Sequence, residues 1–392
     1  MEKISLPERA DWRDKARELG FTFADMHGKP YWDETSAYRF TLREIEDDIE
    51  DPSTELHAMC REAAARIIAS EELTTKLAIP EAFRDLVANS WRDQQPELYG
   101  RFDLAYDGHG PAKLLEYNAD TPTSLYESAS FQWSWLEDQI AAGVLSEGDD
   151  QFNGIHEAMV ARFQELFDPG TDIHFTAVAG NEEDYGTVEC MAWAARDADM
   201  GAHFVELEQI GLSTDGQFLD EEDRVMGVLF KLYPWEDLLK EDYARSIADS
   251  RCLFLEPAWK SVLSNKGLLP VLWEMFEGHP NLLPAYFADD LERSDVSSIF
   301  PNGYVSKPLF SREGASVRIF EGGRKVEASD DAGYGSYPRI LQAYAPLPVF
   351  DGFRPVIGSW IVGGACAGIG LREDRGRITQ DLSRFKPHFI RD

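Results

Sequence analysis

Residues 113–124 read KLLEYNADTPTS, a stretch in which a carboxylate and an amide interrupt an apolar run just before a proline. Glu116 and Asn118 lie two positions apart, so on a β-strand both side chains point to the same face. The preceding stretch, YGRFDLAYDGHGPAK (99–113), supplies a second strand and a turn, DGHG. The sequence therefore predicts a β-hairpin over residues 100–118.

The register of this hairpin decides which side chains share a face. With the turn centred near DGHG, Asp103 lies opposite Glu116, and the neighbouring pair is Arg101 and Asn118. One face then gathers two carboxylates, an amide and a guanidinium. The other face is predicted to point into a core and holds Phe102, Leu104, Leu115 and Tyr117.

Two interpretations of the polar face are open. Two carboxylates and an amide oxygen form an all-oxygen set suited to Mg²⁺ that keeps waters and shares a phosphate. An adjacent arginine would stabilise charge on a transferring phosphoryl group. The alternative is a solvated strand face with a single Arg–Asp ion pair.

The rest of the chain predicts a mixture of α/β and α+β structure, with mixed sheets and flanking helices. The strand–helix–strand order over residues 172–210 indicates an α/β lobe, and the last third reads as mainly antiparallel strands. We expect three parts, at about 1–130, 131–259 and 260–392. The predicted helices cover 53–70, 80–93, 153–167 and 183–201, and the predicted strand regions cover 172–180, 202–210, 304–323, 339–350 and 355–374.

The composition is strongly acidic. The 392 residues include 71 Asp and Glu against 38 Lys and Arg, for a net charge of −33. This charge repels nucleic acid and anionic membranes and would attract a cationic ligand such as a polyamine, although it also serves solubility. The N-terminal stretch lacks the apolar segment of a signal peptide and no window approaches a membrane span, so a soluble cytoplasmic protein is expected.

A second candidate constellation is YVSKPLFSREGAS, where Lys307 ends an apolar strand and a loop with Gly314 follows. Such a loop can fold over a triphosphate while its backbone N–H groups and a strand lysine contact the phosphates. The alternative is a surface strand that ends in a turn.

Two further stretches carry charged candidates. Arg372 follows a strand rich in small residues, which lets a ligand approach, or it pairs with an acid that follows it in the sequence. Glu182 and Glu183 follow a buried strand, where they could hold an amine or favour a helix N-terminus.

Taken together, the chain resembles the glutathionylspermidine synthase family. The resemblance covers nearly the whole chain and rests on GRFD, LLEYNADTPTSL, WEMFEGHPNLLPAYF, VSKPLFSREG, LQAYAPLP and IGSWIVGGACAGIGLRED. It is strongest to the stand-alone acid–amine ligases of that family, which lack an amidase domain. It implies an ATP-grasp fold and the use of ATP and Mg²⁺ to convert a carboxylate into an acyl phosphate that an amine attacks.

The resemblance also implies roles for particular residues. Asp103, Glu116 and Asn118 would bind Mg²⁺, while Arg101 and Arg372 would stabilise the phosphoryl group and the acyl phosphate. The nucleotide would be bound by Arg101, Phe102, Asp103, Lys266, Lys307, Glu313, Gly314, Gln342, Ala343, Tyr344, Ala345, Arg377, Ile378 and Thr379. The substrates would contact Thr121, Glu182 and Glu183.

The predicted function is an ATP-dependent ligase that joins a small-molecule carboxylate to an amine, with a polyamine as a candidate amine. The alternative is a non-catalytic scaffold of the same fold that binds nucleotide or polyamine. The residues do not identify the acid or the amine, because specificity resides in loops that the sequence does not place. Pro122 after Thr121 departs from the small hydroxyl residues that follow EYNAD in glutathione-binding members, so the resemblance does not extend to glutathione as the acid.

Overall fold

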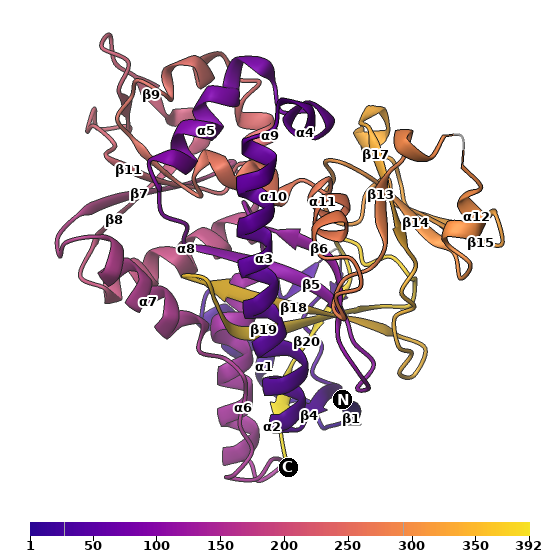
Figure 1. Ribbon diagram of the computed structural model, residues 1–392. Coiled ribbons are helices and arrows are strands. Elements are labelled where there is room, and N and C mark those ends of the chain that lie inside the picture. The colour runs from indigo at the N-terminus through magenta and orange to yellow at the C-terminus, as the bar shows by residue number, and fades with distance from the viewer. Residues whose placement is uncertain (27, 293) are drawn as a thin grey trace.

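A five-stranded antiparallel sheet lies in the middle of the molecule (Figure 1), in a computed structural model that describes residues 1–26, 28–292 and 294–392. Its strand order is β20–β19–β18–β5–β6. The strands are β5 (Tyr99–Ala105), β6 (Lys113–Asn118), β18 (Arg354–Val362), β19 (Ala365–Asp374) and β20 (Arg384–Lys386). The predicted hairpin at 100–118 and the predicted strand region at 355–374, far apart in the sequence, therefore share one sheet.

The predicted hairpin register is confirmed at the polar positions, since Arg101 pairs with Asn118 and Asp103 with Glu116. A β-bulge follows, and Leu104 pairs with Leu114. One extra residue shifts the alternation of side chains, so Leu114 is buried while Leu115 lines a cavity. The prediction that Leu115 points into the core is wrong for this reason.

A four-stranded parallel sheet lies on the left of Figure 1, with the order β12–β11–β7–β8. The strands are β7 (Asp172–Ala177), β8 (Gly201–Glu206), β11 (Val228–Lys231) and β12 (Leu253–Leu255). Helix α8 (Glu182–Asp197) connects β7 to β8. The predicted α/β succession is confirmed.

A second five-stranded sheet, on the right of Figure 1, is antiparallel and has the order β13–β17–β14–β15–β16. Its strands are β13 (Ala285–Phe287), β14 (Tyr304–Pro308), β15 (Arg318–Glu321), β16 (Arg324–Ala328) and β17 (Arg339–Ala343). The antiparallel character predicted for this part of the chain is confirmed.

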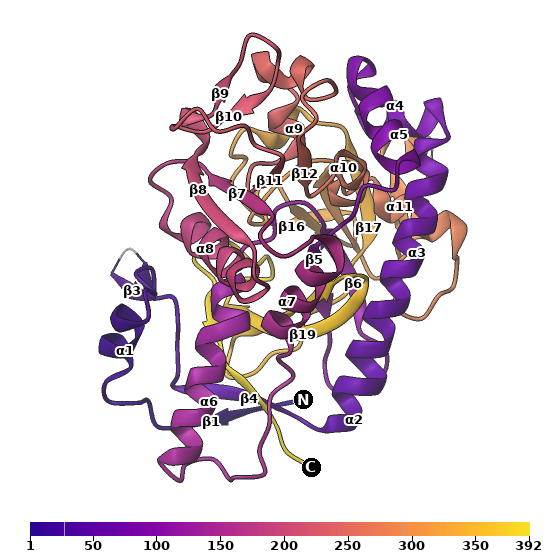
Figure 2. The same ribbon diagram turned by 90° about the vertical axis from the view of Figure 1, so that its left-hand side faces the viewer.

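Helix α3 (Asp51–Ile68) packs on the central sheet and forms the long helix at the right of Figure 2. Pro52 fits its first turn, where no intrahelical N–H bond is lost. Its buried residues recur at helical spacing and form one apolar face. They include Leu56, Met59, Cys60, Ala63, Ala64 and Ile67.

A three-stranded sheet brings the two ends of the described chain together, as both ribbon views show (Figures 1 and 2). Its order is β1 (Glu2–Ser5), β4 (Ser36–Phe40) and β21 (His388–Ile390). The remaining helices are α1 (Trp12–Glu18), α2 (Leu42–Ile45), α4 (Glu71–Lys76), α5 (Arg84–Arg92), α6 (Gln132–Ala141), α7 (Ile155–Leu166), α9 (Trp235–Leu238), α10 (Ser261–Ser264), α11 (Leu268–Met275) and α12 (Val296–Ile299). The remaining strands form two short pairs, β2 (Asp25–Met26) with β3 (Lys29–Pro30) and β9 (Gly211–Leu212) with β10 (Phe218–Leu219).

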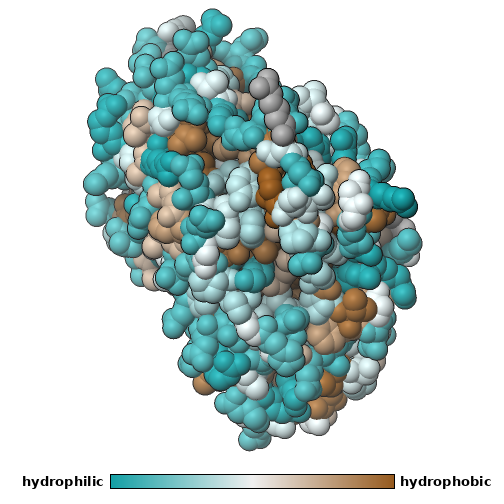
Figure 3. Space-filling model, turned by 45° about the vertical axis from the view of Figure 1, so that its right-hand side comes forward, coloured by the Kyte–Doolittle hydropathy of each residue, from teal (hydrophilic) through white to brown (hydrophobic). Residues whose placement is uncertain are grey.

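Hydrophilic residues cover most of the face drawn in Figure 3, in keeping with the acidic composition. Across the described ranges, we find no helix whose length and apolar character would let it cross a membrane.

Candidate active site

A cavity of about 440 Å³ lies where the three large sheets meet. The central sheet contributes Arg101, the loop after β7 contributes Val178, and the right-hand antiparallel sheet contributes Lys307. The polar face of the predicted hairpin forms one wall. The cavity therefore collects side chains from segments that are distant in the sequence.

On this wall each hairpin carboxylate faces a cation. The Arg101 guanidinium donates to Asp103, with 2.8 Å between Nε and Oδ1, and Lys266 Nζ lies 3.2 Å from Glu116 Oε2. Asn118 Nδ2 is buried and finds no hydrogen-bond partner in the part of the chain that the structure describes. Gly358, on the adjacent strand, makes room for Arg101, because a Cβ there would come within 2.7 Å of Arg101 Cδ.

The charges on this wall shift one another's pKa values. Burial alone would raise the pKa of Glu116, but the ammonium groups of Lys266 and Lys307 outweigh it and lower that pKa. Burial lowers the pKa of Lys307 to about 8, even though Glu116 favours its charged form. Its ammonium donates to the Leu115 carbonyl at 2.8 Å.

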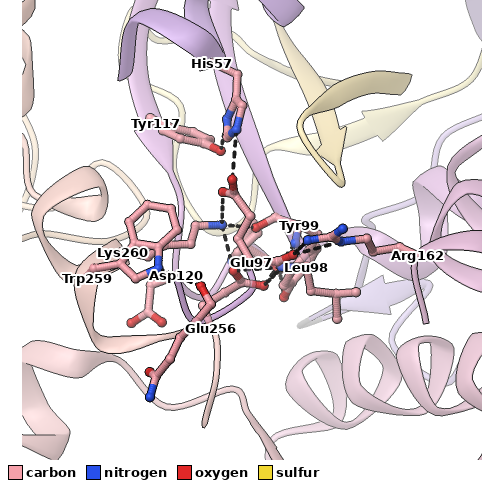
Figure 4. Close-up of polar contacts among 12 residues, drawn as sticks. His57, Glu97, Leu98, Tyr99, Tyr117, Asp120, Arg162, Glu256, Trp259 and Lys260 are labelled. Atoms are coloured by element: carbon pink, nitrogen blue, oxygen red, sulfur yellow. Dashed lines mark hydrogen bonds and ion pairs between the residues drawn. The ribbon is translucent and has the colours of Figure 1, made fainter. Parts of the chain in front are cut away.

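The opposite face of the hairpin rests on a buried polar network (Figure 4). His57 contacts Tyr117 Oη and Glu97 Oε1, each at 3.1 Å. Lys260 Nζ lies 2.8 Å from Glu256 and 3.6 Å from Glu97. The Glu256 carboxylate also accepts hydrogen bonds from the backbone N–H groups of Leu98 and Tyr99, at the start of β5. This network fixes the hairpin from behind.

A loop at 309–316 covers the cavity. Its Arg312 donates to Glu236 Oε1 at 2.6 Å and to Thr121 Oγ1 at 3.3 Å, so the loop contacts two other walls. Gly314 has a φ of +67°, and a Cβ there would lie 2.3 Å from the Thr379 carbonyl oxygen. Only glycine fits this close approach without displacing the backbone.

The far wall holds polar atoms that make no hydrogen bond. Arg372 donates from Nη2 to the carbonyls of Gln380 and Asp381, whereas its Nε finds no acceptor among the described residues. Ser311 Oγ and Thr379 Oγ1 are likewise buried and without a partner there. Together with Asn118 Nδ2, these atoms have unused hydrogen-bonding capacity, and their residues all line the cavity.

The comparisons with known proteins agree with one another. The family model described as glutathionylspermidine synthase preATP-grasp matches residues 3–391. The chain belongs to the glutathionylspermidine synthase family.

Relatives of this glutathionylspermidine synthase-family chain are ligases and synthetases. A protein of Haemophilus influenzae, described as a proposed acid–amine ligase, is 42% identical, with 98% of each chain covered. The trypanothione synthetase of Crithidia fasciculata is 28% identical over 83% of this chain and 52% of that protein. The bifunctional glutathionylspermidine synthetase/amidase of Escherichia coli is 23% identical over 97% of this chain and 63% of that protein. The prediction of an enzyme of the carbon–nitrogen ligase class is confirmed.

A solved structure shows the fold. The glutathione synthetase-like effector of Globodera pallida superposes with a TM-score of 0.55 and 13% identity, covering 91% of this chain and 89% of that one. The predicted fold class, mixed sheets with an ATP-grasp-like arrangement, is confirmed for this family member.

Most of the residues that the sequence singled out line the one cavity. They are Arg101, Asp103, Glu116, Asn118, Thr121, Lys307, Glu313, Gly314, Gln342, Ala343, Tyr344, Ala345, Arg372, Arg377, Ile378 and Thr379. The side chain of Phe102 does not reach it, because Phe102 is fully buried and stacks on Tyr117 with 4.0 Å between ring centroids. Lys266 lies behind Glu116 and donates to the Ser311 carbonyl at 2.9 Å.

The acidic pair at the start of α8 is placed differently from the rest. Asn181 caps this helix and accepts from the N–H groups of Glu183 and Asp184 at 3.1 Å. Glu182 lines a neighbouring groove, and it is Asp184 that lines the cavity. A helix turns about 100° per residue, so neighbouring acids point in different directions.

Sequence reasoning missed several acidic residues of the cavity. Burial and the nearby Glu183 raise the pKa of Asp184 to about 7. Glu236 and Asp237, in the short helix α9 that follows β11, also line the cavity. Their signal in the sequence, the acidic pair in YPWEDLL, does not differ from that of any exposed helix start.

Proposed function

We propose that this enzyme joins a small-molecule carboxylate to an amine, using ATP and an acyl-phosphate intermediate. One observation carries the proposal: a single cavity unites the hairpin carboxylates, cations from the two antiparallel five-stranded sheets, and the 342–345 segment at the end of β17. Triphosphate binding, phosphoryl transfer and a hinge for an adenine ring need these features together.

The residues of the wall fit a magnesium ion bound with the nucleotide. Asp103, Glu116 and Asn118 would hold it through their oxygen atoms. The unpartnered Asn118 Nδ2 is a donor, so it suits a phosphate oxygen of the nucleotide rather than the ion. The set is two carboxylates and one amide, and in the described ranges no cluster of three or more His, Cys, Asp and Glu side chains offers another metal site. When bound, Mg²⁺ neutralises phosphate charge.

The chain's own groups support the two chemical steps. In the first, an oxygen of the substrate carboxylate attacks the γ-phosphorus and ADP leaves, while Arg101 and Lys307 stabilise the phosphoryl charge. In the second, the amine nitrogen attacks the acyl carbon, phosphate leaves and the nitrogen loses a proton. Arg372, with its free Nε, is suited to hold the acyl phosphate.

A non-catalytic scaffold of the same fold is the second candidate. Such a scaffold would bind ligands in the cavity without catalysing phosphoryl transfer. The retention of Asp103, Glu116 and Asn118 beside Arg101 favours the enzyme, because a scaffold needs no such charge arrangement.

The test is ADP and phosphate release by the purified protein with Mg–ATP. Glutathione, amino acids and small peptides would be paired with spermidine, putrescine and simple amines, and mass spectrometry would detect the amide. We expect turnover that requires both an acid and an amine. ATP binding without turnover across a broad panel would favour the scaffold.

A further inference from the structure

A groove of about 460 Å³ lies beside the active-site cavity, between α8 and β8. Four aromatic side chains define this α8–β8 groove: Tyr126, Tyr185, Trp193 and Phe204. Tyr185 and Phe204 are 48% and 42% exposed, and their rings meet edge to face with 5.1 Å between centroids. Large aromatic residues this exposed are unusual at a protein surface unless they contact a ligand or a partner.

The spacing along α8 explains how the groove forms. Glu182, Tyr185, Glu189 and Trp193 follow one another at intervals of three or four residues, so they lie along one face of the helix. Phe204 lies on β8, the edge strand of the parallel sheet, and faces this row.

The charge of the groove is negative. Glu182, Glu189 and Glu206 line it, and no lysine or arginine is among its lining residues in the described ranges. Glu189 is paired with Arg196 at 2.8 Å, but Glu182 and Glu206 make no ion pair with any described residue. Aromatic faces together with free carboxylates favour an organic cation.

The groove adjoins the active-site cavity. Val178 and Asn181 line both hollows, and the first turn of α8 separates them. Asp184 faces the cavity, whereas the next residue, Tyr185, faces the groove. A molecule with its reacting nitrogen beside Asp184 could therefore extend past Asn181 into the groove.

We propose that the α8–β8 groove binds the body of the amine substrate and selects a primary amine with an apolar, preferably aromatic, body. This inference rests on the proposed ligase function. We assign the groove to the amine and not to the acid, because a negatively charged groove repels the body of an anionic substrate. A short amine leaves the aromatic walls unused, and an aliphatic polyamine has no ring to pack against them.

The test measures kcat/KM for amide formation with 2-phenylethylamine, ethylamine and spermidine at saturating ATP and acid. We expect 2-phenylethylamine to exceed ethylamine at least about tenfold in the wild type. Phe204→Ala should remove about tenfold from 2-phenylethylamine and change ethylamine less than about twofold. Phe204→Leu should recover part of the loss, and Val326→Ala, at an exposed residue that lines neither hollow, should change nothing.

A second measurement does not depend on catalysis. Calorimetry of 2-phenylethylamine with wild type and with Phe204→Ala should show binding that the substitution weakens about tenfold. If the wild type makes no amide with any acid but this binding difference is present, the proposed ligase function is contradicted and the proposal of amine binding in the groove is supported. If amide forms but Phe204→Ala leaves the ranking of amines unchanged, the groove proposal is overturned. A rise in KM for the acid alone would also overturn it.

Discussion

The two faces of the β5–β6 hairpin differ in how their polar groups are satisfied. On the rear face, Glu97, Glu256 and Lys260 are almost fully buried and make several ion pairs and hydrogen bonds. On the cavity face, Asn118 Nδ2 and the nearby Arg372 Nε remain without a partner in the described chain. The rear charges hold the strands, whereas the cavity face keeps polar atoms without a partner beside its ion pairs.

Removing a cation from the buried network behind the hairpin tests this difference most directly. We expect Lys260→Met to lower the free energy of unfolding by about 3–5 kcal/mol, because it leaves buried Glu256 without its counter-ion and removes one of the cations around Glu97. Urea unfolding measures this effect. The control, Lys76→Met, removes an exposed partner of Asp290 and should cost at most about 1 kcal/mol. Equal losses for the two variants would contradict a structural role for the rear network.

A substitution on the cavity face should impair activity more than stability. Asp103→Asn is expected to reduce ATP turnover about a hundredfold or more, because the proposed Mg–ATP site loses a charged ligand, with a smaller change in urea unfolding than Lys260→Met because the pair with Arg101 is less buried. Asp107→Asn, in the exposed turn of the same hairpin, is the matched control. Turnover within fivefold of wild type in Asp103→Asn would argue against the site.

The charge of Lys307, on the cavity side, should make nucleotide binding depend on pH. Since burial lowers its pKa to about 8, the ammonium predominates at pH 7 and is lost as the pH rises through 8. Affinity for a non-hydrolysable ATP analogue should therefore fall up to about tenfold between pH 8 and pH 9. In Lys307→Arg the guanidinium stays charged, and a decline as steep as that of wild type would count against this explanation.

The smallest effect is expected in the covering loop. Glu236→Gln weakens the contact with Arg312, a partly exposed pair worth at most about 1 kcal/mol. Amide hydrogen exchange at 309–316 should become faster, while Mg–ATP should slow it in both proteins. Exchange rates at 309–316 that do not change when Mg–ATP is added would show that the loop does not close over the nucleotide.

The sequence was sufficient for the hairpin register, because its polar residues recur with period two and its turn is marked by glycines. It did not predict the bulge after Asp103, since the extra residue, Leu115, and its neighbour Leu114 are both leucine and show no alternation. Nor did it separate Asp184 from Glu182 and Glu183, because three consecutive acids satisfy the same helix start. The contact between Arg312 and Glu236 depends on tertiary packing and leaves no local pattern.

The pairing of β18 with β5 has a consequence for how the protein acquires its activity during synthesis. The hairpin at 99–118 emerges from the ribosome early, but its partner strand, Arg354–Val362, and Arg372 on β19 emerge much later. Until then the hairpin presents an unpaired edge and lacks the opposite wall of the cavity. A nascent chain halted before residue 354 should therefore contain the proposed metal-binding residues without a functional site, and the hairpin edge is where a chaperone would be needed.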